Sequence, residues 1–230
     1  MSTFKRRALL ILGLLLLGGG CNPLLLPYFL FPEESKLPVE YHKLAADDNK
    51  KEVRAVILTY MGMNMNTDMQ HADRDLSVLL AKELQALCQH NEENVTLVNP
   101  LRVEEYKNSH PDWHQNYVDL AKIGRHFHAD YVIYLEIDAM TMYQPGTAGQ
   151  LYRGVANLTL SLVDVNNPDD FTKSPKKIPF TYPSDARGGS IPVDMDTPPD
   201  VFKEKFFTAL AKKLAGNFSA CPTSQHNWSD

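Results

Sequence analysis

The chain has 230 residues, of which 23 are basic and 28 acidic, so its formal net charge is −5 at pH 7. This acidic balance, without a basic cluster interleaved with aromatic residues, is not typical of nucleic-acid-binding proteins, and we exclude nucleic acid as a partner. The length suits one domain with a hydrophobic core of its own, after an export signal and a tether.

The first twenty residues predict a lipoprotein export signal. Basic residues at positions 5–7 precede an apolar run over 8–17, and three glycines lead from this run to Cys21. A basic start, a short apolar core and small residues before the cleavage position are typical of export signals. Ten apolar residues would span about 15 Å as a helix, roughly half the hydrocarbon core of a bilayer. We therefore predict a signal peptide over 1–20, with cleavage before Cys21.

Cys21 and the small residues before it resemble the lipobox of bacterial lipoproteins. In that family the cysteine thiol is acylated and cleavage exposes its amino group; here Gly18 stands in place of the usual leucine. Two or three acyl chains would anchor the protein stably to a membrane, and we expect no other cofactor. One alternative is an ordinary secretory signal with a chance cysteine. Another is a single membrane span that joins 8–17 to the apolar patch 24–31, although an asparagine and two prolines interrupt it.

The composition after the signal predicts a tether, one globular domain and a tail. Residues 21–52 hold the lipidated cysteine and a polar, proline-punctuated tether, 53–216 form the domain, and 217–230 form a flexible tail. The apolar patch 24–31 either lies against lipid or docks on the domain. Asn22 is not the aspartate that retains many lipoproteins at the inner membrane. We predict a periplasm-facing protein of the bacterial cell envelope and favour the outer membrane over the inner one.

Hydrophobic periodicity predicts two strands and two helices in the first half of the domain. Residues 53–60 are continuously apolar and β-branched, as in a strand that is buried on both faces. Leucines recur at i, i+3 and i+4 over 73–88, which predicts an amphipathic helix. A short strand follows at 94–98, residues 101–113 are irregular or a short helix, and 116–127 form the second helix.

The second half predicts a β-hairpin followed by a strand and a helix. Residues 129–142 and 151–165 alternate apolar and polar side chains around a glycine turn, a short strand follows at 178–182, and a helix runs over 198–215. In the first hairpin strand the alternation puts Leu135, Ile137 and Ala139 on the core face and Glu136, Asp138 and Met140 toward solvent. The order β-α-β-α-β-β-β-α predicts an α/β fold of the mixed α+β kind, with three helices packed on a mixed sheet of roughly five strands.

Four stretches of the sequence carry a family resemblance: VRAVILTYMG, NVTLVNP, LAKIGRHFHADYVIYLEI and GVANLTLSLVDV. They resemble the curli-secretion lipoprotein and TolB N-terminal-like superfamily, whose fold is shared by penicillin-binding-protein activating lipoproteins, over about residues 53–214. The resemblance implies a non-enzymatic envelope protein that binds or activates a partner or assembles into a secretion pore. The pore-forming members need amphipathic membrane hairpins, and no clear pair is visible here. Because core and turn residues make up the motif, it bears on fold more than on function.

Two further cysteines, Cys88 and Cys221, leave two arrangements open. In an oxidising envelope they could pair, which would tie the C-terminal tail to the first helix. Alternatively they are two separate thiols, since Cys88 lies on the apolar stripe of the first helix and fits the core.

Four methionines and a histidine follow the first strand closely, at Met61, Met63, Met65, Met69 and His71. Soft thioether sulfurs suit Cu(I), so this loop defines an alternative function, a metal-handling lipoprotein that binds copper or zinc. The competing interpretation is that methionines leaving a strand fill the core or form an apolar contact surface.

Histidine pairs and catalytic motifs carry less information. His110 and His114 in HPDWH have the spacing of a zinc site on a helix, but Pro111 disfavours a regular helix and no third ligand is evident. His126 and His128 end a helix, where a cation suits the dipole. The sequence has no G-x-S-x-G elbow, no P-loop and no G-x-G-x-x-G after a strand. We predict that the protein is not an enzyme and keep an unrecognised hydrolase as a third alternative.

Two long, irregular loops over 61–70 and 187–196 are the first places to look for partner binding, because loops on a rigid scaffold are the usual recognition sites. The residues predicted to contact a partner there are Asn64, Asn66, Arg187 and Asp194. The main hypothesis is a non-catalytic, membrane-tethered protein that binds or supports another envelope protein.

Overall fold

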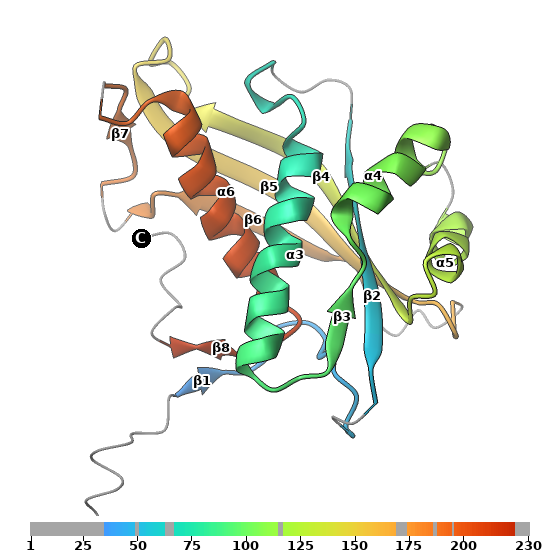
Figure 1. Ribbon diagram of the computed structural model, residues 1–230. Coiled ribbons are helices and arrows are strands. Elements are labelled where there is room, and N and C mark those ends of the chain that lie inside the picture. Colours follow the sequence, from blue (N-terminus) through green and yellow to red (C-terminus); the bar gives the residue numbers. More distant parts are fainter. Residues whose placement is uncertain are drawn as a thin grey trace, which may run out of the picture. The chain divides into compact units, whose positions relative to one another are not determined.

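The described residues of the computed structural model form four α-helices and a mixed sheet (Figure 1). The structure describes residues 35–48, 51–62, 67–114, 117–168, 174–185, 188–194 and 196–223. Its elements in chain order are β1 (Lys36–Leu37), β2 (Val53–Met61), the 3-10 helix η2 (Thr67–Met69), α3 (Ala72–His90), β3 (Val95–Leu97), α4 (Pro100–Ser109), α5 (Tyr117–His126), β4 (Tyr131–Tyr143), β5 (Leu151–Asp164), β6 (Lys176–Tyr182), β7 (Ile191–Pro192), α6 (Pro199–Ala215) and β8 (Cys221–Pro222). Among these residues no helix combines the length and the apolar character needed to cross a membrane.

The sheet combines parallel and antiparallel strands in the order β3-β2-β4-β5-β6, and β7 pairs with β5. β2 runs parallel to both β3 and β4, whereas β4, β5 and β6 pair antiparallel in turn. Parallel neighbours arise from crossovers through helices, and antiparallel neighbours from the hairpin. The predicted mixed α+β fold class is therefore confirmed.

Helices cover both faces of the sheet and create two cores. α3 and α6 lie side by side across one face, where Leu80 and Phe206 belong to the larger core (Figure 1). α4 and α5 cover β2 and the start of β4 on the other face, around Trp113. Ile57 contributes to the larger core and its neighbour Val56 to the smaller one, so β2 must be apolar on both faces.

The helix α4 corrects the prediction of three helices. Periodicity leaves residues 101–113 irregular or a short helix, whereas the structure has ten helical residues from Pro100 to Ser109. Pro100 occupies the first turn, and the Asn99 side chain accepts a hydrogen bond from a backbone N–H of that turn. These are strong helix-start signals. The helix buries two of its ten residues, too few to produce a visible apolar stripe.

A β-bulge in β4 overturns the predicted alternation beyond Ile137. The pairing of β4 with β5 shifts register between Ile137 and Ala139. One extra residue at that point turns each later side chain to the opposite face. Ala139 is therefore exposed, and Met140, which the alternation places toward solvent, is buried in the larger core.

The folded body begins earlier and ends later than the predicted domain 53–216. β1 pairs antiparallel with β8, and the Leu44 backbone N–H donates to the Phe218 carbonyl at 3.2 Å. Both of these side chains are buried in the larger core. The tether prediction is thus wrong for residues 36–48, and the flexible-tail prediction for 217–223. These segments are held by backbone pairing with each other, which leaves no periodic pattern in a short polar sequence.

An ion-pair cluster also holds residues 36–48, which we call the N-terminal arm. The Glu40 carboxylate accepts hydrogen bonds from Lys176 at 3.0 Å and from Lys213 at 2.6 Å. Burial alone would raise the pKa of Glu40, but the hydrogen bonds and charges of Lys213 and Lys176 outweigh it and hold this pKa below 4.5. The contribution of the cluster to stability is therefore present above about pH 4.5 and is lost as the pH falls through the lowered pKa.

Candidate functional site

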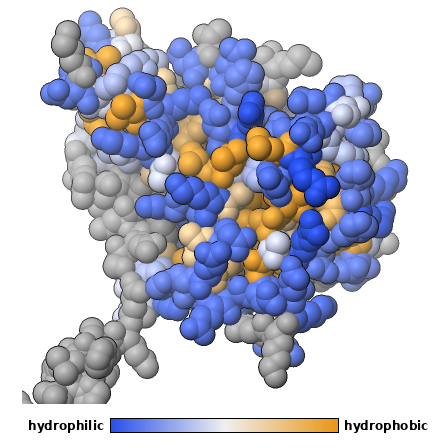
Figure 2. Space-filling view, viewed as in Figure 1, coloured by the Kyte–Doolittle hydropathy of each residue, from blue (hydrophilic) through white to orange (hydrophobic). Residues whose placement is uncertain are grey.

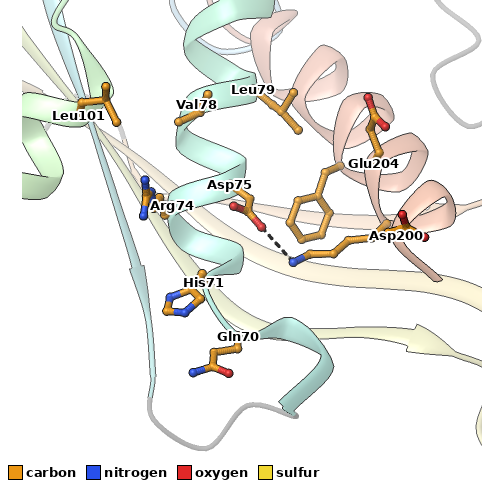
Figure 3. A pocket seen from close by; sticks show the side chains of 11 residues that line it. Gln70, His71, Arg74, Asp75, Val78, Leu79, Leu101, Asp200 and Glu204 are labelled. Atoms are coloured by element: carbon orange, nitrogen blue, oxygen red, sulfur yellow. Dashed lines mark hydrogen bonds and ion pairs between the residues drawn. The ribbon is translucent and has the colours of Figure 1, made fainter.

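A groove with a volume of about 690 Å³ lies on the surface formed by α3, α6 and the start of α4 (Figure 3). We call it the α3–α6 groove. Its lining residues are Gln70, His71, Arg74, Asp75, Val78, Leu79, Leu101, Asp200, Lys203, Glu204 and Phe207.

The helix α3 creates the groove because it carries two stripes of side chains. Its inner stripe, which includes Leu76, Leu80 and Leu84, is buried in the larger core. Its outer stripe lines the groove at positions 71, 74, 75, 78 and 79, the i, i+3, i+4 spacing of one helix face. The core therefore uses one side of the helix and leaves the other for contacts at the surface.

The floor of the groove exposes apolar side chains. Val78 is 41% exposed and Leu101 is 54% exposed. In the described part of the chain, Val193 at 39% is the one other exposed large apolar side chain. Figure 2, viewed as in Figure 1, shows hydrophobic side chains gathered on this face among hydrophilic ones. An exposed apolar patch with a charged rim is typical of a protein contact site.

An ion pair joins the two helices at the groove. Lys203 of α6 donates to the Asp75 carboxylate of α3 at 2.9 Å, and its ammonium lies 5.3 Å from the centroid of the Phe207 ring. The cation attracts both the carboxylate and the face of the ring. This contact bridges α3 and α6 at the surface, above the core that packs the two helices together.

The remaining charges are separated by sign. Figure 3 shows Arg74 and Val78 on the side of α3 that faces α4, and Asp200 and Glu204 on α6. Within the residues that the structure describes, Arg74, Asp200 and Glu204 form no ion pair. Arg74 and the two acidic side chains of α6 thus lie on opposite sides of α3.

His71 lies exposed at one end of the groove and has an unusual backbone conformation. Its φ is 65°, in the left-handed region that residues other than glycine seldom adopt. Such a conformation costs on the order of 1 kcal/mol or more, and residues of this kind cluster at functional sites. Glu92, His128 and Ala148 share this backbone conformation away from the groove, and the sequence singles out His71 only as a metal ligand.

The two methionines of the predicted metal loop that the structure describes, Met61 and Met69, pack in the larger core. Met69 is fully buried in the larger core, and Met61 packs against the same core while half buried. These two thioethers therefore have the packing role that the sequence analysis weighs against copper binding. Met63 and Met65 lie outside the described residues, as do Asn64 and Asn66, two of the predicted partner-binding residues.

Of the other two predicted partner-binding residues, Asp194 lies between β7 and α6. Arg187 is outside the described residues. The Asp194 carboxylate accepts hydrogen bonds from the backbone N–H groups of Asp196 at 3.1 Å and Thr197 at 2.9 Å. Because such a side chain shapes the turn it belongs to, Asp194 has a structural role here.

The histidines of HPDWH do not share a helix face, because α4 ends at Ser109. His110 stacks on Tyr106 and His114 stacks on Tyr60, in each case with ring centroids 4.2 Å apart. No group of three or more His, Cys, Asp or Glu side chains in the described ranges is arranged to hold a metal ion. These two histidines extend the aromatic packing around the smaller core.

Cys88 and Cys221 are both buried and are not joined by a disulfide in the structure. Burial, with the charge and the hydrogen bond of Glu93, raises the pKa of the Cys88 thiol to about 12, against a weaker opposing hydrogen bond from Ser219. The thiol is therefore protonated at neutral pH. Because the thiolate is the reactive form, Cys88 is inert in the folded protein.

We expect iodoacetamide to modify Cys88 only after unfolding. A rise in pKa from 9.0 to about 12 lowers the thiolate fraction at pH 8 by about a thousandfold, in addition to the steric block. Peptide mass spectrometry should find Cys88 unmodified in the native protein and fully modified in urea without a reductant. If modification in urea required a reductant, the cysteine would be in a disulfide and the structure would be wrong at this point.

Comparison with known proteins gives general similarities of fold only. No family model matches the chain, and no curated protein matches it. The PelC dodecamer from Paraburkholderia phytofirmans is similar at 14% identity and a TM-score of 0.42, over 80% of this chain and 96% of that one. Lipoprotein GNA1162 from Neisseria meningitidis has 13% identity and a TM-score of 0.37, over 72% and 99%. Protein XCC0632 from Xanthomonas campestris has 11% identity and a TM-score of 0.37, over 77% and 89%.

These identities and TM-scores are too low to carry an argument about function. The resemblance to the curli-secretion lipoprotein and TolB N-terminal-like superfamily accordingly stays a prediction from sequence. The function is therefore inferred from the residues of this chain.

Proposed function

We propose that this protein is a non-catalytic lipoprotein of the bacterial cell envelope that binds another envelope protein through the α3–α6 groove. The observation that carries the proposal is the clustering of exposed apolar side chains: Val78 and Leu101 lie on one charged-rimmed groove. The signal and Cys21 support a lipid anchor with the body facing the periplasm. Asn22 favours the outer membrane.

The position of the groove suits a tethered binding protein. The chain enters the body at Lys36, whose ammonium donates to the Asn91 side chain at 2.7 Å, at the C-terminal end of α3. Val78 lies thirteen residues earlier, about 20 Å along the helix axis. The groove is therefore about 20 Å from Lys36, the residue near which the described body begins, so a partner in the groove need not contact this residue.

The alternatives have weaker support from the described residues. A copper or zinc site in the loop 61–71 that used Met69 would have to draw this side chain out of the core, which costs the free energy of exposing a buried side chain. A hydrolase would need a nucleophile beside a base, and the sequence nominates no such pair. Binding through an apolar groove needs neither, and it agrees with the non-enzymatic role that the family resemblance implies.

In-cell photo-crosslinking tests the proposal. A photo-crosslinking amino acid at Val78, or separately at Leu101, should give an adduct with the same envelope protein in cells that make this protein naturally. Val193 is the matched control, because it is exposed to a similar extent but does not line the groove. Val78→Asp should abolish the adduct formed from position 101. Equal adducts from all three positions, or none from Val78 and Leu101, would refute the proposal.

A further inference from the structure

The groove is suited to a helix rather than to an extended strand. All of its lining residues belong to helices or to the turn before α3, and no sheet edge lines it. A bound strand would find no strand edge to pair with there, whereas a helix satisfies its backbone groups internally. The outer stripe of α3 also offers side chains at the spacing that packs against another helix.

The size of the groove agrees with this. Its residues on α3 extend from His71 to Leu79, which is about 12 Å along the helix axis, or roughly two helical turns. A helix with a stripe of small or branched apolar side chains could place them on Val78, Leu79 and Leu101, over the edge of the Phe207 ring.

The charges along the groove specify the flanks of such a helix. Asp200 and Glu204 are exposed, four residues apart on one side of α6, and form no ion pair within the described residues. Arg74 is exposed on the side of α3 that faces α4. Lys203 is already satisfied by Asp75. Basic side chains at i and i+4 would therefore match α6, and an acidic side chain would match Arg74.

We propose that the occupant of the α3–α6 groove is an amphipathic α-helix of the partner protein, with a basic flank against α6 and an acidic flank against Arg74. This inference rests on the proposed function and adds the chemistry of the partner. The helix buries its apolar stripe on the groove floor, and the two flanks fix its direction.

Two synthetic helical peptides test this inference. They share one apolar stripe, and the second replaces every lysine of the first with glutamate, so both of its flanks are acidic and turning it end for end cannot restore the match to α6. Binding to residues 21–230 with Cys21→Ser, which removes the need for detergent, is measured by fluorescence anisotropy. The peptide with the basic flank toward α6 should bind more tightly, and Val78→Asp should weaken it by about tenfold or more. The control Val193→Asp should leave its Kd unchanged.

Charge reversal provides the decisive comparison. Replacing Asp200→Lys together with Glu204→Lys should weaken binding of the first peptide and strengthen binding of the second, whose flanks are both acidic. The inference would be overturned if the double substitution left the relative affinity of the two peptides unchanged. It would also be overturned if Val193→Asp weakened binding as much as Val78→Asp. Binding that appears only after residues 21–35 are deleted would overturn it as well, since the chain's own apolar segment would then be the occupant. If position 78 formed a crosslink in cells but neither peptide bound, the inference that the partner presents a helix would be overturned. The proposed function would stand.

Discussion

Replacing Lys107 with methionine is expected to lower the free energy of unfolding by about 3 kcal/mol. Lys107 is 8% exposed, and its ammonium donates to Glu104 at 2.8 Å, to Asp73 at 3.0 Å and to the Thr59 carbonyl at 3.0 Å. It also lies 5.4 Å from the centroid of the Trp113 ring. Methionine fills much of the same space but leaves two carboxylates without their cation. An uncompensated charge is the costly result of breaking a buried ion pair.

Urea unfolding followed by circular dichroism measures this effect. Lys82→Met is the matched control, because Lys82 is exposed on α3, and its cost should stay within about 0.5 kcal/mol. Combining Lys107→Met with Asp73→Asn and Glu104→Gln should recover a large part of the loss, since no unpaired charge remains. A cost below about 1 kcal/mol for Lys107→Met would show that the cluster does not hold α4 to α3 and β2.

Gly154→Ala is expected to destabilise the protein by about 2 kcal/mol. A Cβ at this position in β5 would lie 2.6 Å from Cδ2 and 2.8 Å from Cγ of the Phe206 ring, which is fully buried. The ring cannot turn away in a close-packed core, so α6 must move off the sheet. Because α6 forms one side of the α3–α6 groove, we expect this substitution also to weaken crosslinking from Val78.

The control for this substitution is Gly62→Ala. A Cβ at position 62 meets nothing within 4 Å, and Gly62 is not among the residues with a positive φ. Its effect on the melting temperature should be neutral or slightly stabilising, because alanine restricts the unfolded chain more than glycine does. Equal melting temperatures for the two variants would mean that the helix α6 does not pack on β5 as closely as described.

Most of the fold could be predicted because its elements bury regular apolar patterns. The leucines of α3 and the continuous apolar run of β2 form the core, so their spacing in the sequence predicts these two elements directly. The bulge after Ile137 could not be predicted, since a register shift depends on the pairing of two strands and not on either strand alone. The N-terminal arm was equally hidden, because its backbone pairing with β8 leaves no periodic pattern in the sequence.

Only one end of the candidate site was predicted from the sequence. The loop 61–70 leads to the groove through Gln70 and the neighbouring His71, but the floor is built elsewhere. Val78 lies off the leucine stripe of α3, and such a position is normally an unremarkable exposed residue. Only the folded structure shows that Val78 lies close to Leu101 and to α6, which are distant from it in sequence. A second apolar stripe on a helix is the one local signal that could have indicated this surface.

The tethering of the body to an envelope membrane is the claim on which the other functional statements depend. Mass spectrometry of the N-terminal peptide, from protein purified out of the membranes of its natural host, tests it most directly. We predict a chain that begins at Cys21 and carries acyl chains on that residue. A chain that begins at Met1, or an unmodified thiol at Cys21, would contradict the account.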